Sequence, residues 1–478
     1  MFSTEDTFLT FFLVILSLLT RIWMNNSPDD VVFDEIHFGN FTNWYIHRSF
    51  FFDIHPPLAK LIMAFVAKSA GYDGNINFVT KYENGKEDYY ISLRLTPEII
   101  QSFCSPLIYL SLRCFGVSSF GAFIGGIMIL CENTMLVEGR YILSDGILHF
   151  FSCLHVFAMS YFFRIQSIGS LVFAGVSLGC AISCKYTALG LVAMTGLSQL
   201  FWIIKEKPYF RVILIRACCL IIPIIVIFFG SWFIHFVVLS YEGNGNPYVN
   251  KEFQSTIMGN NNYKGLRING MSIIFRIVDM NIIMHTLNMK SVKPHPFQSS
   301  PIYWPFLFDK WVLFWKKKDR AIICLGSILI HYTITCFLFL SILLLFLKKL
   351  KYQHLFVLTG YIFSYFPFIL VPRSMFLYHY IIPLIFGILE TIMIIDIIFP
   401  RKVSYFLLFA ILILSIFSYF YLYPFAYATN CDDKCFKRRQ WINRWSEGPP
   451  NSYNSVMNYK TNEPNTTVLY GSFPCSCI

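Results

Sequence analysis

The chain has 478 residues, of which 56% are hydrophobic and 14% are charged, and its mean hydropathy is +0.55. A soluble protein carries roughly a quarter charged residues, so this composition excludes the soluble class. The formal net charge is +11. The Lys and Arg residues mostly lie in short blocks beside apolar runs, which indicates membrane topology and not nucleic-acid binding. We therefore predict an all-α polytopic membrane protein that binds no nucleic acid.

Apolar runs of the length that a transmembrane helix needs, about 20 residues, recur along the chain. We predict eleven spans, near residues 7–24, 97–113, 117–133, 143–163, 168–184, 187–204, 212–235, 321–347, 353–371, 375–398 and 403–424. Acidic residues precede the first run and no small-residue cleavage site follows it, so we expect an uncleaved span and not a signal peptide. An odd number of spans places the termini on opposite sides of the membrane.

Basic clusters in short loops predict the orientation of these spans, because Lys and Arg favour the cytoplasmic side. The clusters lie between spans six and seven, eight and nine, and ten and eleven: Lys205, Lys207, Arg211, Lys348, Lys349, Lys351, Arg401 and Lys402. We therefore expect a transmembrane domain over residues 1–424 with a cytoplasmic N-terminus. The loops 25–96 and 236–320 and the tail 425–478 then face the other side. Basic residues at 316–318 and 434–439 oppose this orientation.

The first long loop opens with two adjacent acids, Asp34 and Glu35, followed by His37. Acids directly after a membrane span are costly near lipid unless they have a partner or a task. Adjacent side chains point in different directions, so one acid could act as a base while the other orients a substrate. A solvated loop that happens to carry two acids is the alternative.

The same loop continues through Phe50-Phe51-Phe52-Asp53-Ile54-His55-Pro56-Pro57. A Pro pair is well suited to starting a helix, and apolar residues follow as far as Ala70. This segment is too short to span, so we predict a helix lying in the membrane interface, with the Phe triplet dipping into the headgroup region. Asp53 and His55 beside the Pro pair suggest a further role.

Cationic residues lie at the ends of other spans, on the side of the membrane where we expect the first long loop. They are Arg94, Arg140 and Lys185, and the segment Arg373-Ser-Met-Phe-Leu-Tyr378-His379-Tyr380. Arg can grip a phosphate through its planar fork, and Tyr and His offer neutral donors to the same anion. Taken singly, Arg94, Arg140 and Lys185 also fit structural roles, such as a Lys that snorkels to the interface.

Together these motifs resemble the protein O-mannosyltransferases, the dolichyl-phosphate-mannose–protein mannosyltransferases of the endoplasmic reticulum. The resemblance extends from the first span to the eleventh. It is carried by Asp34-Glu35-x-His37-Phe38-Gly39, Phe51-Phe52-Asp53-x-His55-Pro56-Pro57-Leu58-x-Lys60, Gly179-Cys180-Ala181-Ile182-Ser183-Cys184-Lys185, His295-Pro296-x-x-Ser299-x-Pro301-x-x-Trp304-Pro305 and Arg373-x-x-Phe376-Leu377-Tyr378-His379-Tyr380.

The resemblance implies a GT-C architecture, the fold of lipid-linked-sugar glycosyltransferases, with a lumenal active site. It implies that Asp34 is the catalytic base and that Glu35 lies toward the acceptor peptide. The expected donor-binding residues are Arg94, Arg140, Lys185, Arg373, Tyr378 and His379, and the expected supporting residues are His37, Asp53, His55 and Gln254. Dolichyl phosphate mannose is the expected donor and secretory proteins the acceptors, with no cofactor, no metal site, and a homo- or heterodimer of family members.

The loop 236–320 has only 85 residues, so the lumenal MIR domain that family members usually carry there is expected to be absent. The expected reaction is a single inverting displacement. A lipid phosphodiester leaves as a stable anion, so the enzyme needs a base and cations but no general acid. The alternatives are another polyprenyl-phosphate-sugar glycosyltransferase or a solute transporter, and a transporter would bury charges in the middle of its spans.

Four cysteines lie apart in the polar tail, Cys431 and Cys435 in one cluster and Cys475 and Cys477 in another. In an oxidising lumen they would form disulfides, with three possible pairings. A link between the clusters would close a loop of about 40 residues. The competing interpretation is a cytoplasmic tail, because Cys475-Ser-Cys-Ile478 superficially resembles a prenylation box.

Overall fold

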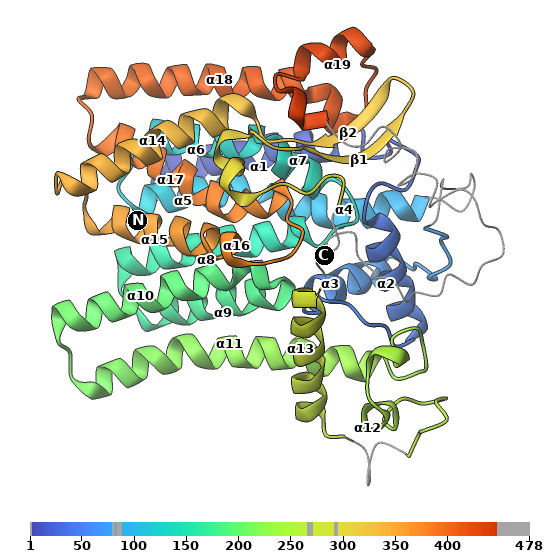
Figure 1. Ribbon diagram of the computed structural model, residues 1–478. Helices are drawn as coiled ribbons and strands as arrows, with labels where there is room; N and C mark the ends of the chain where they lie inside the picture. Colours follow the sequence, from blue (N-terminus) through green and yellow to red (C-terminus); the bar gives the residue numbers. More distant parts are fainter. Residues whose placement is uncertain (1, 79–81, 83–87, 265–270, 291–294, 447–478) are drawn as a thin grey trace.

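Long helices lie side by side in one bundle in the computed structural model, which describes residues 2–78, 82, 88–264, 271–290 and 295–446 (Figure 1). They are α1 (Thr4–Ile22), α4 (Asp88–Ser102), α5 (Cys104–Cys114), α6 (Ser119–Cys131), α8 (Asp145–Ile165), α9 (Ile168–Cys184), α10 (Leu189–Glu206), α11 (Phe210–Val238), α14 (Ile328–Phe346), α15 (Tyr352–Tyr365), α17 (Ile381–Ile397) and α18 (Arg401–Tyr427). Every predicted span contains a helix, and α4 and α5 share the second.

Seven helical segments of the described residues are long and apolar enough to cross a membrane. The count becomes eight if α6 and α7 (Asn133–Gly139), which meet at a bend of 58°, form one span. The most apolar of these helices is α11, and it exposes residues such as Ile222 and Val226, 55% and 62% accessible. An apolar surface of this kind needs lipid around it. The protein is therefore a multi-pass membrane protein, and the total of eleven spans stays a prediction.

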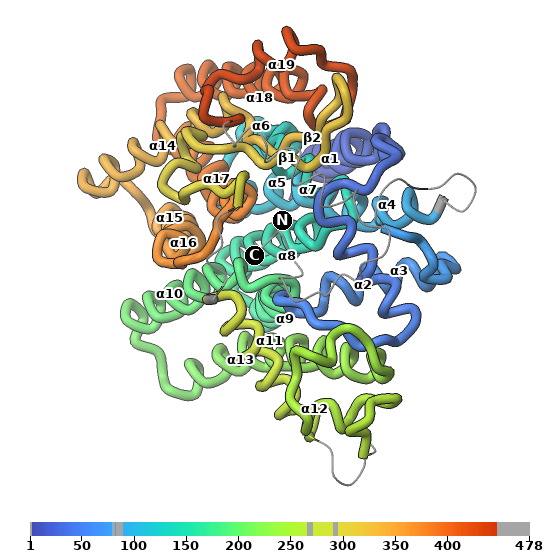
Figure 2. The backbone as a smooth tube through the Cα atoms, turned by 45° about the vertical axis from the view of Figure 1, so that its right-hand side comes forward, coloured from blue at the N-terminus to red at the C-terminus, as the bar shows by residue number. Residues whose placement is uncertain are grey.

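Elements outside the bundle gather at one end of it (Figures 1 and 2). They are α2 (Glu35–His47), α3 (Leu58–Ser69), η2 (Asn246–Tyr248), α12 (Lys251–Gln254), α13 (Ile273–Lys290), η3 (Pro301–Phe306), β1 (Val312–Lys317), β2 (Arg320–Cys324), α19 (Asp433–Arg439) and η5 (Asn443–Ser446). The connections α10–α11, α14–α15 and α17–α18, which carry the basic clusters, lie at the opposite end. This confirms the predicted separation of long loops from basic loops, while the compartment at each end stays a prediction.

The eighth predicted span begins later than its apolar run. Residues 320–324 form β2, which pairs antiparallel with β1 through a bulge between Leu313 and Trp315. The helix α14 starts only at Ile328. Four consecutive buried residues in β2 look like the start of a span by hydropathy, yet they are a short strand against the protein core. The basic residues 316–318 that opposed the predicted orientation belong to the tip of this hairpin.

The segment before α3 lies inside the protein and not in the headgroup region, so the prediction for the Phe triplet was wrong. Phe50, Phe51 and Phe52 are 1%, 1% and 4% exposed. The ring of Phe51 stacks on Phe41 of α2 at 4.7 Å and meets Tyr45 edge-on at 5.1 Å. The aromatic face of α2 thus offers the triplet a dry surface. The predicted helix itself is present as α3.

The tail packs on the hairpin through its backbone, because the Cys431 N–H donates to the carbonyl of Asp319 at 2.7 Å. Cys431 and Cys435 form a disulfide with each other. The pairing is therefore within the first cluster, and no disulfide joins that cluster to the second. Cys475 and Cys477 lie outside the described residues.

Candidate active site

Asp34 is the first residue of the site and is fixed by the start of α2. It is the N-cap of that helix, and its carbonyl accepts hydrogen bonds from the backbone N–H groups of His37 and Phe38 at 2.8 and 3.0 Å. The preceding Phe33 has a positive φ of 47°, and its ring stacks on Phe314 of β1 at 4.0 Å. Asp34 is 1% exposed. A helix N-terminus favours negative charge at this position, whereas burial opposes it.

Glu35 has a different environment from Asp34. Its carboxylate forms a bidentate pair with Arg94, whose Nε and Nη2 donate at 2.7 Å each. The Val32 N–H, the Tyr82 hydroxyl and the Ile142 N–H also donate to Glu35, at 2.9, 3.0 and 3.1 Å. Both side chains of the pair are 0% exposed. Glu35 therefore joins the loop, α4 and the segment before α8, and its expected contact with an acceptor peptide stays a prediction.

Arg94 and Arg140 are engaged by the protein itself, and the expected binding of the donor phosphate stays a prediction for both. The other three N–H groups of Arg94 donate to the carbonyls of Asn25, Pro28 and Asp30. Arg140 donates to the last carbonyls of α1 and to the Met24 carbonyl, and its guanidinium lies 4.3 Å from the Tyr427 ring centre. Cations commonly satisfy helix C-terminal carbonyls in this way.

Asp53 and Lys60 form a buried ion pair, each side chain being 2% exposed. The Lys60 ammonium also donates to the carbonyls of His55 and Pro56, at 2.8 and 3.1 Å. Asp53 accepts from the backbone N–H of Ile54 at 2.7 Å. The pair therefore shapes the loop that carries His55, and Asp53 is a positioning residue.

His55 lies among cations from three other parts of the chain. Burial, together with nearby Lys185, Lys60, Arg373 and His379, holds the pKa of His55 well below its ordinary value. The ring is therefore neutral at neutral pH. Its Nε2 is buried and has no hydrogen-bond partner in the part of the chain that the structure describes. A buried ring nitrogen of this kind is available to a ligand.

Lys185 caps the end of α9 and reaches the start of α8, where its ammonium donates to Asp145 at 3.0 Å. It lies 5.7 Å from the ring centre of Tyr378. Tyr378 is within electrostatic reach of Asp34, and its buried hydroxyl has no hydrogen-bond partner among the described residues. Lys185, Asp145, Tyr378 and His379 line one small cavity. Tyr378 thus lies between Asp34 on one side and Lys185 on the other.

Arg373 and His379 complete the side of the site that holds Lys185. Their side chains approach each other to 3.5 Å between Nη2 and Nε2, and Arg373 also donates to the Asn288 side chain of α13. The His379 ring stacks on Tyr378 at 4.7 Å, and Nδ1 of His379 lies 3.0 Å from the Phe376 carbonyl. Arg373 is half-buried and lines a cavity of about 560 Å³ that also contains Lys310 and Arg444.

His37 and Gln254 lie at the margin. His37 lines a small hollow with aromatic walls, formed by Phe41, Trp44, Phe52 and Tyr248. Gln254 donates to the carbonyls of Asn246 and Val249 and accepts from Asn262. Gln254 therefore holds together the loop around α12. This loop packs on the Phe triplet through Tyr248.

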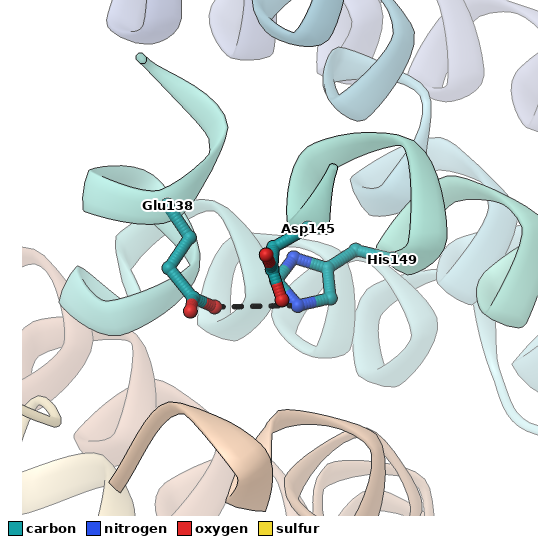
Figure 3. A group of neighbouring side chains, drawn as sticks. All are labelled: Glu138, Asp145 and His149. Carbon is teal, nitrogen blue, oxygen red and sulfur yellow. Dashed lines mark ion pairs between the residues drawn. The ribbon is translucent and has the colours of Figure 1, made fainter. Parts of the chain in front are cut away.

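One group of side chains in the described part of the chain has the spacing of a metal site: Glu138, Asp145 and His149 (Figure 3). The hydrogen bonds of Gln101 determine which nitrogen of His149 carries the proton. Its Oε1 accepts from Arg21 at 3.3 Å, so its amide nitrogen faces His149 Nδ1 at 3.1 Å and donates to it. The neutral ring then carries its proton on Nε2, which lies 3.4 Å from Glu138. A protonated nitrogen is no metal ligand, so His149 in this tautomer supplies no ligand, and it faces a Glu138 oxygen that has no hydrogen-bond partner among the described residues.

Three side chains that shape the site were not among the predicted site residues. Lys60 holds the His55 loop, Asp145 holds Lys185, and Asn288 contacts Arg373. Asp145 carried a usable signal, since an acid at the mouth of an apolar span requires a partner. Asn288 carried none, because nothing in a single polar residue on a distant helix indicates the loop it will contact.

Comparisons with known proteins agree with this fold and these motifs. Residues 11–240 match the family described as dolichyl-phosphate-mannose-protein mannosyltransferase, and residues 274–445 match the C-terminal four-transmembrane region of protein-O-mannosyltransferase. Dolichyl-phosphate-mannose–protein mannosyltransferase 4 of Schizosaccharomyces pombe is 33% identical over 302 residues, 59% of this chain and 38% of that protein. Mannosyltransferase 3 of Saccharomyces cerevisiae is 30% identical over 268 residues, 53% and 36% of the two chains. The chain spans about a third of the length of these curated relatives.

Solved structures establish the fold independently. A chain of the Saccharomyces cerevisiae protein O-mannosyltransferase Pmt1–Pmt2 complex bound to the sugar donor matches with a TM-score of 0.87, 19% identity and 95% coverage of both chains. The oligosaccharyltransferase of Archaeoglobus fulgidus matches with a TM-score of 0.54 and 11% identity over 98% of this chain and 61% of that one. The architecture is therefore that of GT-C glycosyltransferases. With two matched segments that together cover most of its length, the chain belongs to the protein O-mannosyltransferase family.

Proposed function

We propose that this protein transfers mannose from dolichyl phosphate mannose to Ser or Thr hydroxyls of proteins in the lumen of the endoplasmic reticulum. One observation carries the proposal: the Tyr378 hydroxyl, which has no partner among the described residues, lies within electrostatic reach of Asp34, and its ring centre is 5.7 Å from the Lys185 ammonium. The donor and the acceptor in this proposal are taken from the relatives, which are named dolichyl-phosphate-mannose–protein mannosyltransferases.

The proposed reaction needs one base and one anion site. The Ser or Thr hydroxyl gives its proton to Asp34 while its oxygen attacks the anomeric carbon of mannose. The bond between that carbon and the phosphate oxygen breaks, and the lipid phosphate leaves with the electron pair. Lys185 and Arg373 hold the negative charge on the phosphate, and Tyr378 and neutral His55 donate hydrogen bonds to it. One displacement inverts the anomeric centre and leaves no covalent intermediate.

The remaining residues act through others. Glu35 with Arg94, and Asp53 with Lys60, are proposed as positioning pairs that hold the loops carrying Asp34 and His55. Arg140 is proposed to fix the end of α1. His37 borders a hollow beside α2, where an acceptor side chain could lie. The N-terminus is proposed to be cytoplasmic, from the basic clusters, and the active chain to pair with a family member, since a solved relative is a Pmt1–Pmt2 complex.

The test uses membranes from cells that produce the full chain, compared with membranes that lack it. They receive labelled dolichyl phosphate mannose and either a Ser/Thr peptide, an Asn-sequon peptide or no peptide. We expect label on the Ser/Thr peptide only. Label on Asn or on lipid would support another lipid-linked glycosyltransferase, and no chain-dependent label in any arm would contradict the proposal.

The matched variants are Asp34→Asn and, as control, Asp73→Asn in the same loop but on the surface. Asp34→Asn keeps the shape of the side chain and removes the proton acceptor, so the rate should fall by roughly 10²–10⁴-fold. The control should keep the normal rate. A near-normal rate for Asp34→Asn, at equal amounts of protein in the membrane, would refute its role as the base.

A further inference from the structure

The helix α13 (Ile273–Lys290) presents two unlike faces. One is packed into the protein through Arg276, Ile277, Met280 and Met284, which are between 0% and 8% exposed. The other is exposed and apolar. Its large side chains are Ile274, Phe275, Val278, Ile282 and Met289, which are 61%, 64%, 47%, 59% and 43% exposed. Ile274 and Phe275 are adjacent, and Val278, Ile282 and Met289 follow Phe275 at successive intervals of three, four and seven residues, so the five side chains form a single stripe.

This stripe is the reverse of a surface helix in water, which turns its apolar residues inward. His285 is the one polar side chain on it in the described part of the helix, and its ring can lie at a boundary between lipid and water. Five large apolar side chains along one exposed helix face are not explained as scattered surface residues, and they indicate a partner of low polarity.

The placement of α13 identifies that partner. The helix runs across the direction of the membrane spans, at the end of the bundle that holds the long loops (Figure 1). It docks on the last turns of α11, where the Arg276 guanidinium lies 5.0 Å from the Phe236 ring centre. The neighbouring α11 residues Phe233, Ile234 and Val237 are each 51% exposed, on a helix whose apolar surface faces lipid. The stripe therefore continues a lipid-facing surface.

We propose that α13 lies flat in the bilayer interface with this stripe in the lipid. It is not among the helices long and apolar enough to span, and a helix that lies across the spans with an exposed apolar face suits the interfacial layer. Lipid molecules are thus the partner of the exposed face, and the inner face belongs to the site.

The inner side of α13 connects the membrane surface to the candidate phosphate site. Asn288 accepts from Arg373, and Asn281 accepts from the hydroxyl of Tyr186, one residue after Lys185. A helix seated in the interface would hold Arg373 at the depth where the phosphate of a membrane-borne donor lies. This functional step rests on the proposed function, whereas the position of α13 in the lipid does not.

The first experiment measures the position of α13 alone. A photo-crosslinking amino acid is placed singly at Val278 or Ile282 of the full chain in vesicles of phosphatidylcholine and phosphatidylethanolamine. Val226 on α11 is the lipid-facing reference, and Asn261, exposed in the loop before α13, is the water-facing reference. Mass spectrometry should find phospholipid adducts at Val278 and Ile282 as intense as at Val226, with none at Asn261. Absence of lipid adducts at both positions, or adducts to a second protein chain in their place, would overturn the proposal.

The second experiment measures the link to the site. Val278→Asp and Ile282→Asp place a charge in the lipid and should raise the KM for dolichyl phosphate mannose severalfold, with the KM for the peptide unchanged. Asn261→Asp is the matched control and should alter neither. Lipid adducts without any effect on donor KM would refute the link to Arg373 and retain the interfacial position. Absence of transfer in the unmodified chain would refute the proposed function and leave the crosslinking result standing.

Discussion

Buried charge is arranged in pairs at this site, and the pairs divide the predicted residues into two kinds. Glu35 with Arg94 and Asp53 with Lys60 satisfy each other inside the protein. Lys185 is paired as well, with Asp145, but it and Arg373 also lie near groups that can bind a ligand, namely Tyr378 and His55. A buried pair contributes little net stability, but removing one partner leaves an uncompensated charge. The two kinds should therefore respond differently to substitution.

The first prediction concerns the Glu35–Arg94 pair. Arg94→Leu leaves Glu35 buried without its bidentate partner, and breaking such a pair costs about 3–5 kcal/mol. We expect a marked fall in the thermal midpoint of the purified protein in detergent, followed by tryptophan fluorescence. The control is Lys317→Ala, which breaks the exposed pair with Asp30 and should cost less than about 1 kcal/mol. A normal midpoint for Arg94→Leu with a raised donor KM would contradict this prediction and indicate that Arg94 binds the donor phosphate.

Residue identities could be predicted from the sequence better than residue contacts. Asp34, Lys185, Arg373, Tyr378 and His379 were expected to share one site, and the structure brings them together. Arg94 was expected among the donor-binding residues because of the family resemblance. Its actual anion is Glu35, 59 positions away in the chain. Composition and spacing do not distinguish a carboxylate of the protein from a phosphate of the substrate, since both satisfy the same fork.

At the scale of elements, helices could be predicted from apolar length and the short strand could not. Every predicted span contains a helix, because runs of about 20 apolar residues have few other solutions in a membrane. The predicted start of the eighth span at residues 320–324 was wrong, because a buried strand and a buried helical segment look alike in hydropathy. The prediction that the Phe triplet dips into the headgroup region was wrong for a related reason. Its aromatic partners on α2, such as Phe41, lie several residues away and are invisible to a local hydropathy argument.

The element-scale prediction compares two arginines that were given the same role. Arg140 holds the end of α1 through the carbonyls of Arg21 and Met24, so Arg140→Ala should lower the amount of folded protein and the thermal midpoint. Arg373 lies at a cavity wall, so Arg373→Ala should keep a normal midpoint and raise the donor KM, with the acceptor KM unchanged. Thermal unfolding and separate donor and acceptor titrations on each variant give both quantities. The reverse assignment would follow if Arg140→Ala were stable and defective in donor binding.

At the scale of the whole molecule, the two ends of the bundle differ in chemistry. Long loops, the hairpin and the start of the tail lie at one end, and the basic connections lie at the other (Figure 1). The tail carries the Cys431–Cys435 disulfide and contacts the hairpin through Asp319. Disulfides persist in oxidising compartments. The basic connections and the disulfide therefore agree on the orientation, since they assign opposite ends to opposite sides.

The last prediction tests that orientation on the tail itself. In sealed microsomes, a membrane-impermeant thiol reagent added outside should not modify the peptide that contains Cys431 and Cys435. Permeabilisation alone should leave it unmodified, because both thiols are in the disulfide. Permeabilisation with reduction should modify both, as measured by mass spectrometry of that peptide. Cys431→Ser is the control, since its loss frees Cys435 and should permit labelling after permeabilisation without reduction. Labelling of the tail before permeabilisation would place it in the cytoplasm and contradict the odd number of spans, because a cytoplasmic N-terminus and a cytoplasmic tail require an even one.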